Sequence, residues 1–188
     1  MTMKTVTLSL IITLSLLASG CMADDDGDEG NENNWRFMQK QRDVAAVNNL
    51  QYQEECGSCH LAYPPGLLPG RSWKKIMTHL DQHFDDNAEL EAGVQKQLTE
   101  YLLLHSADNS DYRRSGRIMR SLNENEVPIR ITELVYFKHQ HNEIPQRMIR
   151  GNDKVGSLSN CNACHRRAEQ GFFNEREINI PGFGAWDD

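Results

Sequence analysis

Apolar and polar positions divide the chain into three parts. Val6–Leu17 is a predominantly apolar run that follows a short positive start. Residues 22–34 are acidic and rich in Gly and Asn, so they cannot bury a core. From Trp35 onward, apolar residues recur at helical spacing, without the alternation that is typical of strands. The pattern predicts an all-α globular part with little or no sheet, preceded by a leader and a polar tether.

Three helices are expected within the globular part. The first covers Ser72–Phe84, where apolar residues share one face and Ser72 is a candidate N-cap. The second extends from about Ala88 to Leu104. The third extends from about Thr132 to Asn142, with a proline on either side.

The first 20 residues have the features of a secretory signal peptide. A positive start at Met1–Lys4 precedes the apolar run, and small residues follow it in Ala18–Gly20. The run is too short for a stable membrane span, and no other apolar run is long enough to cross a bilayer. The mature protein is therefore expected on the far side of a bacterial inner membrane.

Cys21 gives the leader a second feature. The sequence LLASGC, which ends at Cys21, resembles a bacterial lipobox, although Ala18 stands where Leu is commoner. In lipobox proteins this cysteine becomes the lipidated first residue, so residues 21–34 would be an anchor and an acidic tether. The alternative is ordinary cleavage near Gly20 or Ala23, which would leave a soluble periplasmic protein.

The net charge of −7 comes mainly from the tether. Asp24–Glu32 holds six acidic residues and no basic residue, so the remainder of the chain is near neutral. No concentrated basic stripe is present, and a nucleic-acid partner is not expected. Arginines do cluster in the C-terminal half. These arginines are Arg113, Arg114, Arg117, Arg120, Arg147, Arg150, Arg166 and Arg167. Most are interpreted as a solvated face. The alternatives are clamps for haem propionates or a docking patch for an acidic partner.

Two copies of C-x-x-C-H carry the chemistry. They are Cys56-Gly57-Ser58-Cys59-His60 and Cys161-Asn162-Ala163-Cys164-His165, and this spacing is the c-type haem attachment motif. Two thiols three residues apart can bond both vinyl groups of one porphyrin, and the adjacent histidine then lies on the iron axis. We therefore predict two covalently bound haem c groups, with His60 and His165 as proximal ligands.

The same cysteines have other interpretations. One C-x-x-C could be a redox dithiol, and four thiolates could bind one zinc ion. Two complete C-x-x-C-H motifs that follow an export signal favour haem attachment over a redox dithiol or a zinc site. The fifth cysteine, Cys21, is accounted for by the lipobox.

Five further histidines compete for the distal position on each iron. On the third predicted helix, His141 shares a stripe with apolar residues, whereas His139 points to nearly the opposite side. On the first predicted helix, His83 lies at the edge of the apolar face and is preferred over His79. His105 continues an apolar stripe and remains a rival.

Methionine is an alternative distal ligand. Met77 has the phase of a core residue, while Met119 and Met148 sit beside arginine, which favours a surface position. Ligation by Met and His would raise the reduction potential relative to two histidines.

Several short sequence segments around these motifs resemble those of the bacterial dihaem cytochrome c family. The likeness extends from about Trp35 to Pro181 and rests on ECGSCHLAYPP (55–65), LLP (67–69), Ser72-Trp73, His83-Phe84, Ile131-Thr132, His141, CNACH (161–165), Gly171-Phe172 and Ile180-Pro181.

The resemblance implies an exported electron carrier with two bis-histidine haems, whose distal ligands fall on His83 and His141. It also implies redox partners such as a small monohaem cytochrome or a membrane cytochrome b. Local pairing, His60 with His83 and His165 with His141, would give one haem to each of two lobes, about 35–110 and 111–188. A crossed pairing is left open.

The main functional alternative is an enzyme or a small-ligand sensor. A peroxidase-like or nitrogen-oxide-reducing protein would need one iron with an open or labile sixth position. The chain is short for a two-domain haem peroxidase.

Overall fold

The computed structural model describes residues 42–186. The predicted signal peptide, Cys21 and the acidic tether lie outside the described residues. Within them, no helix is long and apolar enough to span a membrane.

Short helices make up most of the ordered structure. They are α2 (Leu50–Gly57), α3 (Gly70–Met77), α4 (Ala92–Leu104), α5 (Arg113–Ser121), α6 (Val135–His141), α7 (Gln146–Ile149) and α8 (Cys161–Cys164). Among residues 42–186, four 3-10 turns lie between helices, at Pro65–Leu67, Leu80–Gln82, Ala107–Asn109 and Ile131–Glu133, and two more follow α8, at Ala168–Gln170 and Glu175–Glu177.

One small sheet occurs among the described residues. Its two strands, β1 (Asn179–Ile180) and β2 (Gly184–Ala185), are antiparallel, and Asn179 pairs with Ala185. The expectation of an all-α protein with little or no sheet is therefore confirmed.

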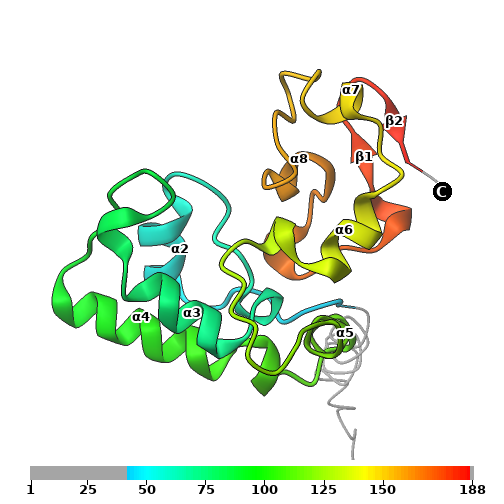
Figure 1. Cartoon of the computed structure of the whole chain (residues 1–188). Helices are drawn as coiled ribbons and strands as arrows, with labels where there is room; N and C mark the ends of the chain where they lie inside the picture. Colours follow the sequence, from blue (N-terminus) through cyan, green and yellow to red (C-terminus); the bar gives the residue numbers. More distant parts are fainter. Residues whose placement is uncertain (1–41, 187–188) are drawn as a thin grey trace, which may run out of the picture.

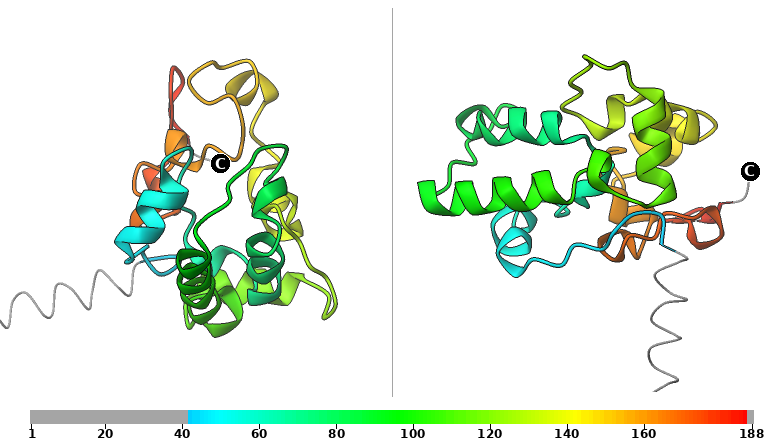
Figure 2. Two further views of the ribbon diagram at one scale, coloured as in Figure 1. Left: turned by 90° about the vertical axis from the view of Figure 1, so that its left-hand side faces the viewer. Right: turned by 90° about the horizontal axis from the view of Figure 1, so that it is seen from below.

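The helices form two groups in space. Helices α2, α3 and α4 lie together on one side, and α6, α7, α8 and the two strands lie on the other (Figure 1). The same division is visible from below, in the right-hand view of Figure 2. The proposed boundary between residues 110 and 111 stays a prediction, because the largest apolar cluster draws on both sides of it.

Helix α3 differs from the predicted helix over Ser72–Phe84. It begins at Gly70 after Pro69, so Ser72 lies buried inside the helix and is not its N-cap. It ends at Met77, because the Thr78 hydroxyl donates to the carbonyl groups of Lys74 and Lys75 (both 3.0 Å) and competes with continued helix bonding.

The other two predicted helices begin later than expected. Helix α4 starts at Ala92, where the Glu91 carboxylate accepts from the backbone N–H groups of Gly93 (2.9 Å) and Val94 (3.2 Å). The stretch from residue 132 starts as a 3-10 turn, and the α-helix α6 follows from Val135.

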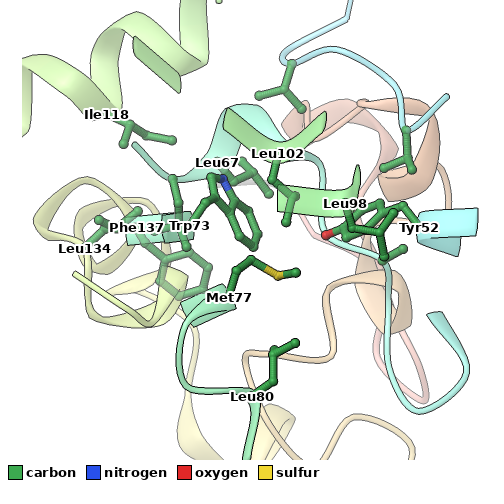
Figure 3. Close-up of a cluster of buried hydrophobic side chains, with 14 residues drawn as sticks. Tyr52, Leu67, Trp73, Met77, Leu80, Leu98, Leu102, Ile118, Leu134 and Phe137 are labelled. Carbon is green, nitrogen blue, oxygen red and sulfur yellow. The ribbon is translucent and has the colours of Figure 1, made fainter. Parts of the chain in front are cut away.

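The main core lies between α3 and α4 and reaches α5 and α6. Trp73 and Met77 of α3 lie near Leu98 and Leu102 of α4, as Figure 3 shows. The Trp73 indole N–H donates to the Pro65 carbonyl (2.8 Å), which satisfies its polar atom inside the cluster. Ile118, Leu134 and Phe137 extend this cluster into the C-terminal half.

The N-terminal end of the described chain is fastened to the C-terminal half. The backbone N–H groups of Asp43 (2.9 Å) and Val44 (3.3 Å) donate to the Gly171 carbonyl. Gly171 has a positive φ of 82°, and a Cβ there would collide with the Val44 carbonyl oxygen. Only glycine fits this close approach without a shift of the backbone.

Candidate haem sites

The first motif lies at the end of α2. Cys56 is in the last turn and half-buried, whereas Cys59 and His60 follow the helix and are exposed. The Nδ1 atom of His60 is 2.8 Å from the Leu61 carbonyl oxygen, so Nδ1 carries the proton and donates. The other ring nitrogen, Nε2, is then free to bind a metal.

The second motif forms α8 itself. Cys161 is buried, Cys164 is half-buried, and His165 follows directly after the helix. Burial, and next His141 and Arg114, lowers the pKa of His165 to about 4. Its imidazole is therefore neutral near pH 7, which is the form that binds a metal.

The four motif cysteines form no disulfide with one another. Burial raises the pKa of Cys56 and of Cys161 to about 11, and it also raises the pKa of Cys164. A reactive dithiol requires a lowered pKa, so a thioredoxin-like site is disfavoured. Within residues 42–186, no three His, Cys, Asp or Glu side chains gather as they would around a zinc ion.

Each motif histidine faces one of the two preferred distal candidates. The ring centroids of His60 and His83 are 6.0 Å apart, and those of His141 and His165 are 6.3 Å apart. The structure thus brings the histidines together as local pairs and not as crossed pairs. The three remaining histidines, His79, His105 and His139, are exposed.

The two distal candidates are held in different ways. His83 begins a tight turn in which His83 and Asp86 exchange backbone hydrogen bonds of 2.8 and 3.1 Å, and Phe84 and Asp85 have positive φ. His141 is the last residue of α6, where its Nδ1 is 2.9 Å from the Phe137 carbonyl oxygen and its ring stacks on Phe137 at 3.9 Å.

The three candidate methionines differ in burial. Met77 is buried in the main core, as expected, and Met119 is half-buried. Met148 is also half-buried, so the surface position that the neighbouring arginines suggested for both Met119 and Met148 is not what the structure shows. The reason is that successive residues of α7 point in different directions, so Met148 packs against an apolar cluster while Arg147 is exposed.

Comparisons with known proteins agree with this geometry. The family model described as Dihaem cytochrome c matches residues 52–173. No curated protein matches the sequence. A dihaem c-type cytochrome from Shewanella baltica OS155, solved by X-ray crystallography, is 44% identical; the match covers 73% of this chain and 96% of that chain, with a TM-score of 0.62. A dihaem cytochrome c from Rhodobacter sphaeroides is 40% identical over 69% of this chain and 100% of that chain, also with a TM-score of 0.62.

This chain belongs to the dihaem cytochrome c family. It therefore carries two covalently attached haem c groups, with Cys56, Cys59, Cys161 and Cys164 in the attachment motifs. Electron transfer is the general role that this family assignment supports.

The C-terminal half of this dihaem cytochrome has room for a haem. A cavity of about 620 Å³ is lined by His141, Cys161, Cys164 and His165. Cofactor pockets commonly measure about 300–1,000 Å³. The cavity also has an apolar wall, as a porphyrin plate requires, formed by Leu67, Ile118, Ile131, Leu134, Phe137, Ile144, Met148, Ile149, Val155, Leu158, Phe173, Ile178, Ile180 and Trp186.

Arg114 adds a polar feature to this cavity wall. Its buried Nε has no hydrogen-bond partner, and Arg113 and Arg117 line the same cavity. A carboxylate of a haem propionate would satisfy such an orphaned guanidinium donor. The residues present thus fit the group.

The N-terminal half has its own cavity beside the distal candidate. It measures about 640 Å³ and is lined by His83 and Phe84 together with Lys75, Ile76, His79, Asp81, Gln82, Asp85, Asp86, Asn87 and Ile129. The cysteines of the first motif and His60 are not among the residues that line it.

One polar network near the second site has no counterpart in the sequence analysis. Arg114 donates to the Asp43 carboxylate (3.1 Å), the Phe173 carbonyl (3.1 Å) and the Tyr136 hydroxyl (3.2 Å). The Phe173 ring in turn lies 5.3 Å from the His165 ring. No local sequence signal distinguishes Arg114 from the neighbouring arginines, because its partners are distant in sequence.

Proposed function

We propose that this dihaem cytochrome is an exported, non-enzymatic electron carrier in which two histidines bind each iron. His60 and His83 bind the first iron, and His165 and His141 bind the second. Support comes from the spacing of the two histidine pairs, from the family, and from the cavity that both His141 and His165 line.

The spacing of the rings is the observation that carries the proposal. An iron held between two imidazole nitrogens, with metal–nitrogen bonds of about 2 Å each, separates the two ring centroids by roughly 6 Å. The separations of 6.0 and 6.3 Å match this value on both sides of the molecule.

The protein's own residues would fill the axial positions of each iron and orient the histidine rings. The bound haem groups supply one-electron redox chemistry at their irons. Two histidines on each iron occupy both axial positions, so small molecules are kept off the metal. The hydrogen bond from His60 to Leu61 and the stacking of His141 on Phe137 fix the ring orientations. A carrier of this kind changes little in geometry when it is reduced.

The leader places the carrier outside the cytoplasm. Residues 1–20 export the chain, and lipidated Cys21 holds it on the periplasmic side of a bacterial membrane through an acidic tether. Its partners are other redox proteins, of the small cytochrome or membrane cytochrome b type. The membrane is contacted by the lipid anchor only.

Carbon monoxide distinguishes the carrier from an enzyme or a sensor. We expect the visible spectrum of the fully reduced holoprotein to stay unchanged when carbon monoxide is added, because no axial position is open. Rapid binding at one haem would instead support a peroxidase-like, nitrogen-oxide-reducing or ligand-sensing protein with a labile ligand.

A further inference from the structure

The segment directly after the first haem attachment motif packs against the second motif at one small cluster. Leu61, which directly follows the first motif, packs in a buried cluster with Cys161 of the second motif and with Ala168. Tyr63 and Phe173 pack against the same cluster from the side. Leu61 and Cys161 are about a hundred residues apart in sequence, yet they pack together.

Tyr63 connects one side of the contact to the other. Its ring lies 5.1 Å from the His60 ring, at an interplanar angle of 30°. Its hydroxyl donates to the Ser159 carbonyl (2.7 Å), two residues before Cys161. Its own carbonyl accepts from the Tyr52 hydroxyl (2.9 Å), so the backbone as well as the ring is held in place.

Building on the proposed function, we infer that Tyr63 is the contact across which an electron passes between the two haem sites. The step balances without a co-reactant. One iron loses an electron and goes from ferrous to ferric, the other gains it and goes from ferric to ferrous, and no bond is made or broken. Tyr63 is neither oxidised nor deprotonated in this step.

The packing of Tyr63 explains why this position is favourable. A void leaves the atoms that line it without contacts, and electron tunnelling weakens steeply across such a gap. The Tyr63 ring contacts the His60 ring on one side and packs against the cluster that contains Cys161 on the other. Burial raises the pKa of the Tyr63 hydroxyl to about 12. The hydroxyl therefore keeps its proton, and no proton movement accompanies the electron.

Two substitutions separate the ring from its hydrogen bond. Tyr63→Phe keeps the ring and removes the bond to Ser159, whereas Tyr63→Leu removes the ring. Tyr101→Leu is a matched control, because Tyr101 is also a half-buried tyrosine, and its ring contacts are to Tyr52 and His105. The rate of exchange between the two haems is measured in half-reduced holoprotein by exchange NMR of the haem methyl signals, alongside the spectrum and both midpoint potentials.

The expected pattern is specific to the ring. Tyr63→Leu should slow the exchange on the order of tenfold, because a gap replaces packed atoms, whereas Tyr63→Phe and Tyr101→Leu should change it by less than about twofold. Both haems should stay low-spin in all three variants. An exchange rate in Tyr63→Leu equal to that of the wild type, with both haems low-spin, overturns this inference alone. A similar slowing in Tyr63→Phe also overturns it, since the hydrogen bond would then be the important feature. A high-spin haem in the unmodified protein would instead count against the proposed function.

Discussion

At the scale of single residues, helical phase separated the histidines correctly where a helix was present. His141 lies on the inner side of α6 and stacks on Phe137, while His139 is exposed. Helical phase also favoured His83, but its premise is wrong there, because His83 follows a 3-10 turn and does not lie on a helix. Whether His83 and His141 bind iron stays a prediction.

His141→Ala should open one iron. Removal of the imidazole leaves one axial position without a protein ligand, so one of the two haems should become high-spin in the visible and EPR spectra. His139→Ala is the matched control, since it changes an exposed histidine on the same helix. A high-spin haem in His139→Ala, with none in His141→Ala, would contradict the assignment.

Other residues near the haem sites could not be identified from the sequence. Arg114 contacts Asp43 and Phe173, which are 71 and 59 positions away, and Tyr63 contacts Ser159, which is 96 positions away. Periodicity reports which side of an element is apolar, but it does not report which elements meet. The motif cysteines and histidines were identifiable because haem attachment requires their C-x-x-C-H spacing, which is visible in the sequence.

At the scale of elements, composition and periodicity predicted the all-α class and the approximate positions of α3, α4 and α6. They did not predict α2, α5, α7 and α8, nor where α3 stops. The apolar positions of the first predicted helix do face the core, since Trp73, Met77 and Leu80 are all buried. The helix nevertheless ends at Met77. A chain can keep apolar residues buried through a 3-10 turn and a hairpin-like turn, so apolar spacing alone did not locate this end.

Gly171→Ala should be among the most destabilising small changes in the chain. The new Cβ would meet the Val44 carbonyl oxygen at a positive φ of 82°, and the contact between the first described segment and the C-terminal half would have to move. We expect a loss of about 3 kcal/mol or more in the free energy of unfolding of the holoprotein, measured by denaturant titration.

Gly156→Ala provides the matched control for this loss. Gly156 also has a positive φ, of 69°, but a Cβ there meets nothing within 4 Å. Only the backbone penalty of about 1–2 kcal/mol is therefore expected. Equal losses of unfolding free energy in the two variants would show that the close approach of Gly171 to Val44 adds nothing to the cost of the Gly171→Ala substitution.

At the scale of the whole molecule, the two halves of the described chain share one apolar core. The largest apolar cluster contains residues from α3 and α4 as well as from α5 and α6, so the two halves are not independent cores. The division into lobes at about 35–110 and 111–188 stays a prediction.

The anchor is a property of the whole exported chain. Cys21→Ser should move the protein from the membrane fraction to the soluble periplasmic fraction, because serine cannot receive the lipid. Its haem content should stay the same, since Cys21 is not part of either attachment motif. Cell fractionation with detection of the haem measures this, and a wild-type protein that is already soluble would contradict the anchor.

The most direct test of the account is the EPR and visible spectrum of the oxidised holoprotein, recorded with a determination of haem per chain. The account predicts two haems per chain, both low-spin, because a histidine binds each iron on each side. A single haem per chain, or a high-spin signal from either iron in the unmodified protein, would contradict it.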